Sequence, residues 1–382
     1  MKILLIHSYY QLSGGEEVVF HKEKECLSKT EDVETLTFEN KPGLKGAFQF
    51  ILSLWNLSGA RKVKKMIGRF QPDVIHIHNW HYGIGPILIR VAKKNKIPVV
   101  LTLHNHRLIC PSAILLHKGK IFSDSITASF PWKAVFKKVY RNSLLQTFWL
   151  AFIIWFHKII GTWKMVDKYI VVADFAKELF LKSSLGISAD QIVVKPNFTE
   201  RPEVNEGKKS SHFLFIGRLS KEKGIHVLLE AFKQTNFELH IGGEGPLQDL
   251  VEKTCEENKN INYLGYLEKK QVQQSMYDCT ALVVPSICYE MMPLSIIEAF
   301  ALGKPIIASK LGVIESMIHH KFNGLQFIPG NSTDLKLQLT YWNDLNEPEK
   351  DKYKQNVLSL YNSKYTPEQN TQQLLNIYKN IC

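Results

Sequence analysis

The sequence predicts an α/β protein with two doubly wound, Rossmann-like domains, and three observations support this prediction. Short apolar runs alternate with helical patterns in the first half, and the alternation restarts in the second half. Such alternation indicates parallel sheets with helices on both faces. A polar stretch with two prolines, residues 195–211, separates the halves. The chain has 382 residues, too many for one ordinary core but enough for two.

The apolar runs define the expected strands and the domain boundaries. In the first half they are KILLIHSY (2–9), VETLTF (33–38), VIHIHN (74–79), PVVLTLHN (98–105), KYIVVA (168–173) and QIVVKPN (191–197). In the second half they are HFLFIGRL (212–219), FELHIGG (237–243), INYLGYL (261–267), ALVVPS (281–286) and PIIASK (305–310). We expect domains at 1–197 and 212–365, a linker at 198–211, and a C-terminal helix at 366–382 that packs back toward the first domain.

Composition narrows the class of protein. The chain is 45% hydrophobic and 22% charged, which is typical of globular proteins. A net charge of +12 predicts an anionic partner, namely nucleic acid, a phosphorylated substrate or an acidic membrane. The six cysteines have neither CxxC nor zinc-site spacing, and the N-terminal apolar run is too short for a signal peptide. We therefore expect reduced thiols and a cytoplasmic location, on the inner face of the membrane if the protein binds lipid.

Residues 144–163 allow two interpretations. The segment is long and apolar, but Gln146, His157 and Lys158 interrupt it, so a transmembrane helix is the least favoured reading. Between residues 130 and 168 the only acid is Asp167, and the bases are Lys133, Lys137, Lys138, Arg141, Lys158, Lys164 and Lys168. Bases beside bulky aromatics favour a helix in an anionic membrane interface. A buried helix of a large domain is equally consistent with the pattern.

Two glycine-containing loops of the second half predict a phosphate site. In FIGRLSKEKG (215–224), Gly217 ends a strand, and Arg218 and Lys223 precede a helix that begins near Gly224. Cations beside a helix N-terminus can hold a diphosphate. In IGGEGP (241–246), Gly243 permits close approach of a ligand, and Pro246 is expected at the first position of a helix. Loop residues without a ligand would give the same patterns.

The first half offers a glycine turn and a histidine group. Gly14 and Gly15 follow the first strand in SGGEE (13–17), but neither GxGxxG nor a P-loop pattern is present. His104 ends a predicted strand and could face a ligand. His76, His78, His81 and His106 raise a metal alternative, with His76 and His78 on one face of a strand. No carboxylate stands at chelating spacing, so we expect no metal site.

Two glutamates in an otherwise apolar segment, YEMMPLSIIEAFALGKPIIAS (289–309), require an explanation. Charges are rarely buried without partners. Pro293 is suited to begin a helix, which places Glu290 in the loop before it and Glu298 within it. Carboxylates accept several O–H bonds, so this pair suits the hydroxyl groups of a sugar and a ribose.

Taken together and in this order, GRLSKEKG, GGEGP and the Glu290–Glu298 pair followed by EAFALGKPIIAS resemble glycosyltransferase family 4. The resemblance spans nearly the whole chain and implies the GT-B fold and a retaining, nucleotide-sugar-dependent, metal-independent enzyme. The first domain would bind the acceptor and the second the donor. The implied catalytic residues are Glu290, Arg218, Lys223 and His104. The implied donor-binding residues are Gly14, Gly15, Gly217, Gly243, Tyr266, Leu267, Met292, Pro293, Leu294 and Glu298.

The resemblance also implies the partners. The co-substrate would be a UDP- or GDP-sugar, with no permanently bound cofactor and no metal, which fits the lack of an Asp-x-Asp motif. The acceptor would be a glycan or a lipid-linked saccharide in cell-surface polysaccharide synthesis, with residues 130–168 touching an anionic membrane. Asn105, Met291 and Met292 depart from residues common in relatives. Two alternatives stay open, another GT-B sugar-nucleotide enzyme (an epimerase or a phosphorylase) and, less favoured, a basic nucleic-acid-binding protein.

Overall fold

A computed structural model describes residues 1–11, 14–205 and 211–382 of the chain. The chain divides into two compact units. Unit 1 comprises Met1–His117, Phe122–Pro196 and Glu368–Cys382, and unit 2 comprises Lys118–Ile121 and Asn197–Pro367. Residues 206–210 of the expected linker and Ser13 of the SGGEE motif lie outside the described residues. Residues 195–199 belonged to the expected linker or its edge, yet Lys195, Asn197, Phe198 and Thr199 are buried.

Unit 1 contains a parallel six-stranded sheet. Its strands, in order across the sheet, are β2 (Asp32–Glu39), β1 (Lys2–Tyr9), β3 (Val74–Ile77), β4 (Val99–Thr102), β7 (Lys168–Val171) and β8 (Ile192–Val194). Its helices are α1 (Gly15–Leu27), α2 (Gly43–Leu52), α3 (Leu57–Phe70), α4 (Ile87–Lys94), α5 (Trp132–Phe136), α6 (Leu144–Ile159), α7 (Asp174–Leu181) and α15 (Pro367–Lys379). Its short elements are β5 (Leu116–His117), η1 (Trp163–Met165) and η2 (Ala189–Gln191), whereas β6 (Lys120–Ile121) falls in unit 2.

Unit 2 repeats the same plan. The strand order is β11 (Ile261–Gly265), β10 (Leu239–Gly242), β9 (Phe213–Ile216), β12 (Ala281–Val284), β13 (Ile306–Ser309) and β14 (Gly324–Phe327), all parallel. The helices are η3 (Lys221–Lys223), α8 (Ile225–Lys233), α9 (Gln248–Glu257), α10 (Lys269–Asp278), α11 (Leu294–Ala301), α12 (Gly312–Met317), α13 (Ser332–Asp344) and α14 (Glu347–Lys364). The α/β prediction is therefore confirmed. Within the two six-stranded sheets only β14 was missing from the expected strands, and the two-residue strands β5 and β6 were not expected either.

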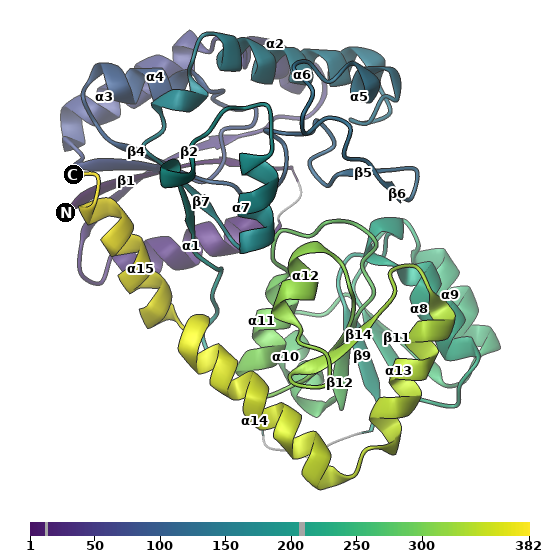
Figure 1. Cartoon of the computed structure of the whole chain (residues 1–382). Helices are drawn as coiled ribbons and strands as arrows, with labels where there is room; N and C mark the ends of the chain where they lie inside the picture. Colours follow the sequence, from purple (N-terminus) through teal and green to yellow (C-terminus); the bar gives the residue numbers. More distant parts are fainter. Residues whose placement is uncertain (12–13, 206–210) are drawn as a thin grey trace. The chain divides into compact units, whose positions relative to one another are not determined.

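Each sheet is covered by helices whose apolar residues form the core. In unit 2, α8, α9 and α13 lie on one face of the sheet, where Phe232 and Trp342 are buried against the strands (Figure 1). In unit 1, α1 and α15 supply Phe20, Leu374 and Tyr378 to the core beneath β1, β3, β4 and β7. The last helix of the chain therefore completes the hydrophobic core beneath the first sheet.

The ambiguous segment 144–163 forms α6 with two different faces. Thr147, Leu150, Ile154 and His157 are buried, whereas the aromatic side chains on the opposite face are half-exposed. Each of the two interpretations of the sequence thus fits one face of the helix. A transmembrane helix would need about 20 residues, and none of the helices in the described part of the chain is long and apolar enough to cross a bilayer.

The contribution of α15 to the first core can be measured with Leu374→Ala. Leu374 is fully buried, so the substitution leaves a cavity and is expected to reduce the free energy of unfolding by about 2–5 kcal/mol. Gln373→Ala, on the exposed side of the same helix, should change it by less than about 0.5 kcal/mol. Urea denaturation followed by circular dichroism measures both. Equal midpoints for the two variants would contradict the packing of α15 on the sheet.

Candidate active site

The site in unit 2 lies where the strand order of the sheet reverses. β9 and β12 are neighbours, with β10 and β11 beyond β9 and β13 and β14 beyond β12. In doubly wound sheets, ligands bind beside the carboxyl ends of the strands at this point. The loop after β9 carries Gly217, Arg218 and Lys223, and the loop after β12 carries Glu290. The sequence motifs of the second half therefore converge on one edge of one sheet.

A glycine allows the two loops to touch. Gly224 has a φ of +76°, and a side-chain carbon placed on it would lie 1.9 Å from the carbonyl oxygen of Pro285. Only glycine tolerates both this backbone conformation and this approach. The amide of Ile287 donates a hydrogen bond of 2.9 Å to the carbonyl of Glu222, which joins the loops further. The loop after β9 is thus held directly against the loop after β12.

This contact brings the predicted cation and the predicted acid together. The ammonium of Lys223 donates to Oε1 of Glu290 at 2.6 Å, and the hydroxyl of Ser286 donates to the same oxygen at 2.9 Å. Burial acts to lower the pKa of Lys223, but the neighbouring Glu290 carboxylate outweighs it and the pKa is raised. Lys223 is therefore a protonated cation held by Glu290, and Arg218, five residues earlier in the same loop, is exposed.

The glycine turn after β10 packs against the same loop. The amide of Gly217 donates to the carbonyl of Gly242 at 3.1 Å, and the amide of Leu219 donates to that of Glu244 at 2.8 Å. Gly243 has a φ of +128°, and a side-chain carbon there would lie 2.0 Å from the carbonyl oxygen of Gly217. The expectation for Pro246 was wrong: it lies in a turn, and α9 begins at Gln248. In this structure the glycines serve close packing of two loops.

The remaining predicted donor residues surround the start of α11 and the end of β11. Pro293 immediately precedes α11, which begins at Leu294, one residue later than expected, and Glu298 is half-buried in its second turn. Met292 is buried, and its sulfur accepts a hydrogen bond of 3.2 Å from the amide of Asn197. At the end of β11, Tyr266 is largely exposed and Leu267 is half-buried.

In unit 1, the predicted residues follow β1 and β4. Gly14 precedes α1, and Gly15 is its first residue. His104 follows β4 and lies 3.1 Å from His78, measured between Nε2 of His104 and Nδ1 of His78. Burial lowers the pKa of His104 to about 3, so its ring is neutral at physiological pH. A neutral imidazole can donate or accept one hydrogen bond on each side.

A polar cluster next to His104 was not foreseen from the sequence. Asn79 donates to Oε1 of Glu16 at 2.8 Å, and the Asn105 amide lies 3.4 Å from Oε2 of the same carboxylate. Burial raises the pKa of Glu16 to about 8, although Arg107 opposes the shift. The only signal in the sequence was an acid directly after the glycine pair.

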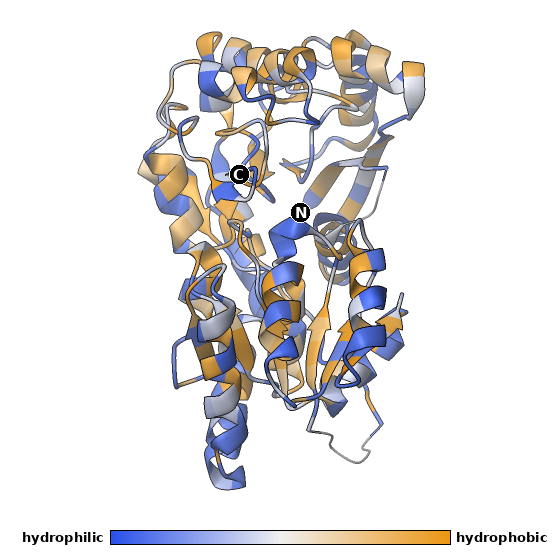
Figure 2. Ribbon diagram, turned by 90° about the vertical axis from the view of Figure 1, so that its right-hand side faces the viewer, coloured by the Kyte–Doolittle hydropathy of each residue, from blue (hydrophilic) through white to orange (hydrophobic). Residues whose placement is uncertain are grey.

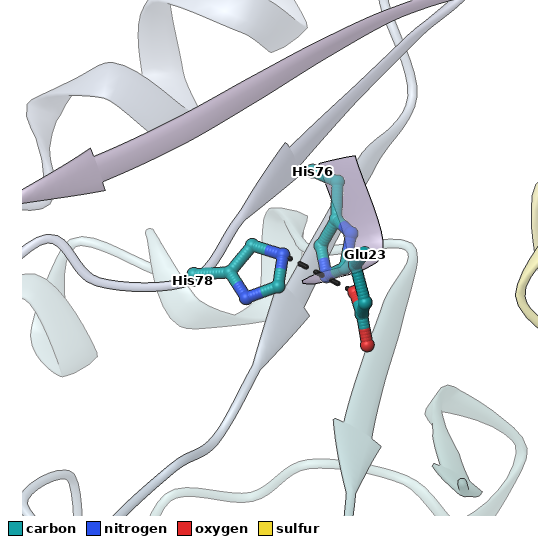
Figure 3. Close-up of side chains that lie close together, drawn as sticks. All are labelled: Glu23, His76 and His78. Carbon is teal, nitrogen blue, oxygen red and sulfur yellow. Dashed lines mark ion pairs between the residues drawn. The ribbon is translucent and has the colours of Figure 1, made fainter. Parts of the chain in front are cut away.

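The histidine strand of unit 1 forms a buried network that includes an acid (Figure 3). Glu23, His76 and His78 place one potential metal-ligand atom each within 4.8 Å of one another. The ammonium of Lys195 lies 2.6 Å from Oε1 of Glu23 and is itself buried. Against the expectation from the sequence, α1 thus supplies a carboxylate to the histidines.

The hydrogen bonds within the cluster of Glu23, His76 and His78 make it a poor metal site. Nδ1 of His76 lies 2.6 Å from the Tyr378 hydroxyl, and its Nε2 lies 2.7 Å from the Thr102 hydroxyl, so both ring nitrogens have partners. Lys195 supplies the positive charge that balances the Glu23 carboxylate. A bound cation would have to displace both the ammonium and the hydroxyl groups. These residues therefore suit a structural network rather than a metal.

Family models and sequence relatives place the chain among glycosyltransferases. The model for Glycosyltransferase Family 4 matches residues 18–201, and the model for Glycosyl transferases group 1 matches residues 197–380. The chain is 28% identical over 357 residues to the uncharacterized glycosyltransferase MJ1178 of Methanocaldococcus jannaschii, covering 88% of this chain and 86% of that protein. It is 25% identical over 323 residues to alpha-monoglucosyldiacylglycerol synthase of Acholeplasma laidlawii, covering 76% and 73%.

Solved structures show the same fold. The structure of Anabaena Alr3699/HepE with UDP superposes with a TM-score of 0.72 at 16% identity, with both chains fully covered. Sucrose-phosphate synthase of Thermosynechococcus elongatus gives 0.72 at 16% identity, covering 100% of this chain and 98% of that one. The fold, together with the family models and the sequence relatives, identifies a glycosyltransferase of GT-B type. The chain belongs to glycosyltransferase family 4.

The buried histidines of unit 1 predict acid sensitivity. His7 is fully buried against Phe20, and burial lowers its pKa to about 4. Because this folded pKa lies below the unfolded value of 6.5, stability is fully present above pH 6.5 and falls as the pH drops toward 4. His7 alone should account for about 2 kcal/mol between pH 7.5 and 5.

Thermal unfolding of wild type and His7→Phe at these two pH values tests this expectation. The variant should lose less stability on acidification, although His76, His78 and His104 still contribute. His226→Phe, at an exposed position of α8, is the control and should behave like wild type. The same loss in wild type and His7→Phe would show that His7 does not resist protonation.

Proposed function

We propose that this glycosyltransferase moves a sugar from a nucleoside diphosphate sugar, with UDP or GDP as the nucleotide, to a glycan or a lipid-linked acceptor. The reaction would retain the anomeric configuration, need no metal, and serve cell-surface polysaccharide synthesis. The observation that carries the proposal is the Lys223–Glu290 pair at the switch point of the unit 2 sheet, with Arg218 in the same loop after β9 as Lys223. The UDP and UDP-glucose complexes of Anabaena HepE are consistent with such a donor.

Each predicted residue has a chemical task in this proposal. Arg218 and Lys223 neutralise the diphosphate as the bond between it and the sugar breaks. Glu290 accepts hydrogen bonds from hydroxyl groups of the sugar, and Glu298 accepts hydrogen bonds from those of the ribose. Amides at the start of α11 orient the phosphates.

The bond changes balance without a further reactant. The acceptor oxygen bonds to the anomeric carbon on the face that the diphosphate leaves, and its proton passes to the departing phosphate oxygen. His104 lies on the acceptor side in this proposal, neutral and fixed by His78. Proton NMR of the first glycoside formed measures the anomeric configuration directly. A rearranged nucleotide sugar in place of a glycoside would point to the epimerase alternative.

The acceptor is proposed from relatives and from surface chemistry. Similar proteins include a lipopolysaccharide N-acetylglucosaminetransferase of Salmonella typhimurium, 27% identical over 51% of this chain and 55% of that protein, and an O-antigen mannosyltransferase of Escherichia coli. Acceptors of this kind are linked to membrane lipids. The basic, aromatic segment 130–168 of unit 1 would bring the enzyme to an anionic membrane surface.

Calorimetric titration with UDP, GDP and ADP tests the donor site. Wild type should bind one of these diphosphates, and Glu298→Ala should weaken binding roughly tenfold to a hundredfold, because a charged hydrogen bond contributes about 1.5–3 kcal/mol. Arg218→Ala should reduce affinity for the diphosphate while leaving affinity for the free nucleoside unchanged. Glu256→Ala and Lys233→Ala, at exposed positions of unit 2, are the matched controls. Undiminished binding in Glu298→Ala would contradict the ribose role.

Vesicle binding tests the membrane surface. Lys133, Lys137 and Lys138 are exposed, and each lysine near an anionic surface contributes about 1 kcal/mol. Replacing all three with glutamine should weaken binding to vesicles containing phosphatidylglycerol about tenfold to a hundredfold. The control triple replaces Lys253, Lys269 and Lys270, which are exposed in unit 2. Sedimentation with vesicles at low and high salt gives both affinities. If the two triple variants bind equally, segment 130–168 is not the membrane contact.

A further inference from the structure

Unit 1 contains a large pocket that the donor site does not use. Its volume is 570 Å³, and it is lined chiefly by α2, by the loop that ends at Arg141, and by α6. This volume falls within the roughly 300–1,000 Å³ that is usual for small-molecule sites. The wall is fixed by a hydrogen bond of 3.0 Å from the Trp149 indole to the carbonyl of Phe50. The pocket is therefore a formed feature of the unit.

The lining combines apolar side chains with two positively charged side chains. Phe50, Ile51, Tyr82, Leu145, Phe148 and Trp149 supply the apolar part. Lys41 and Arg141 supply two cations, and no acid occurs among the described residues that line the pocket. The Arg141 guanidinium lies 5.5 Å from the centre of the Tyr140 ring, which also lines the pocket. A hydrocarbon chain with an anionic head matches this combination of surfaces.

The solvent-exposed surface around the pocket carries large apolar side chains. Leu44 and Phe48 of α2 are 90% and 63% exposed, and Leu145 of α6 is 77% exposed. Phe136 of α5 is 70% exposed. The helices at the top of Figure 2 contain many hydrophobic residues, drawn in orange. By their places in Figure 1, these helices include α2 and α6. Exposed apolar patches of this kind mark interaction sites.

Charge decides which partner fits this surface. No acid occurs between Glu39 and Asp73, or between Asp124 and Asp167, and these two segments contain α2, α3, α5 and α6. Lys41, Lys45 and Arg141 stand among the exposed apolar residues. Exposed aromatic and aliphatic side chains between cations are typical of a surface that enters an anionic lipid interface.

We propose that this pocket holds the hydrocarbon chain of a membrane lipid phosphate that serves as the sugar acceptor, with Lys41 and Arg141 paired to the phosphate. The inference rests on the proposed transferase function, because it names the chemical class of the acceptor. α2 and α5 enter the lipid interface beside the pocket, so the chain passes into unit 1 without crossing water. The hydrocarbon chain thus supplies binding energy remote from the head-group atom that accepts the sugar.

Calorimetry with decyl phosphate, below its micellar concentration, is the test. Wild type should bind it at least tenfold more tightly than inorganic phosphate or decyl maltoside, which each offer only one part of the ligand. Ala47→Trp fills the pocket from an exposed position of α2, and it should lower affinity at least tenfold. Ser58→Trp, exposed on α3 outside the pocket, should leave it unchanged. Lys41→Ala with Arg141→Ala should remove the preference for decyl phosphate over decyl maltoside.

Nucleotide titration of the same samples separates the two proposals. Nucleotide binding without decyl phosphate binding overturns the pocket assignment and leaves the transferase proposal intact. Decyl phosphate binding without any nucleotide binding overturns the acceptor role. Equal affinity of wild type and Ala47→Trp for decyl phosphate, with both proteins folded by circular dichroism, places the ligand elsewhere and overturns the assignment. Loss of decyl phosphate binding in Ala47→Trp, with nucleotide binding retained, supports it.

Discussion

The close approach of two loops at the switch point of unit 2 determines the geometry of the candidate site. Gly224 places the backbone of one loop against Pro285 of the other, and any side chain at position 224 would collide with that carbonyl. The contact sets Lys223 beside Glu290. A protonated lysine and a carboxylate held in this way form a charge pattern that exists before any ligand arrives. Such preorganised charge is what stabilises a developing diphosphate most effectively.

This arrangement also links the proposed diphosphate contact of Lys223 to the proposed sugar contact of Glu290, which lie in separate sequence motifs. A diphosphate that approaches Lys223 competes with Glu290 for the same ammonium group. Ser286 donates a second hydrogen bond to that carboxylate oxygen, so under the proposed function Glu290 would keep a partner if Lys223 turned toward a phosphate. The proposed leaving-group contact and the proposed sugar contact are therefore coupled through one pair of side chains.

Unit 1 has a different organising feature, a buried network beneath its sheet. Lys195 neutralises Glu23, and His76 contacts both Thr102 and Tyr378. Because Tyr378 belongs to α15, the end of the chain is tied to the first sheet. The chain passes between the units four times, at 117/118, 121/122, 196/197 and 367/368. The apolar, acid-free helices α2, α5 and α6 belong to this same unit. The proposed membrane surface and the proposed lipid pocket thus both belong to unit 1.

The sequence by itself determined the class of fold and most of the strands. Strands of a parallel sheet are buried on both faces and read as continuous apolar runs, and the predicted strand at 2–9 matches β1. β14 was missed because GLQF is short and contains glycine and glutamine, so it has no clear apolar run. The positions of Arg218 and Glu290 after strands, and of Glu298 within a helix, were also predictable from the sequence.

Only the tertiary structure decided which side chains meet. Lys223 and Glu290 are 67 residues apart, Glu23 and Lys195 are 172 apart, and His76 and Tyr378 are 302 apart. The proposed lipid pocket likewise joins α2 to α6. The sequence does not reveal that α2 is exposed, because its leucine and phenylalanine residues resemble those of an ordinary buried face. Periodicity records local conformation and local burial. Pairing over long separations depends on strand order and on where loops approach one another, which no local pattern contains.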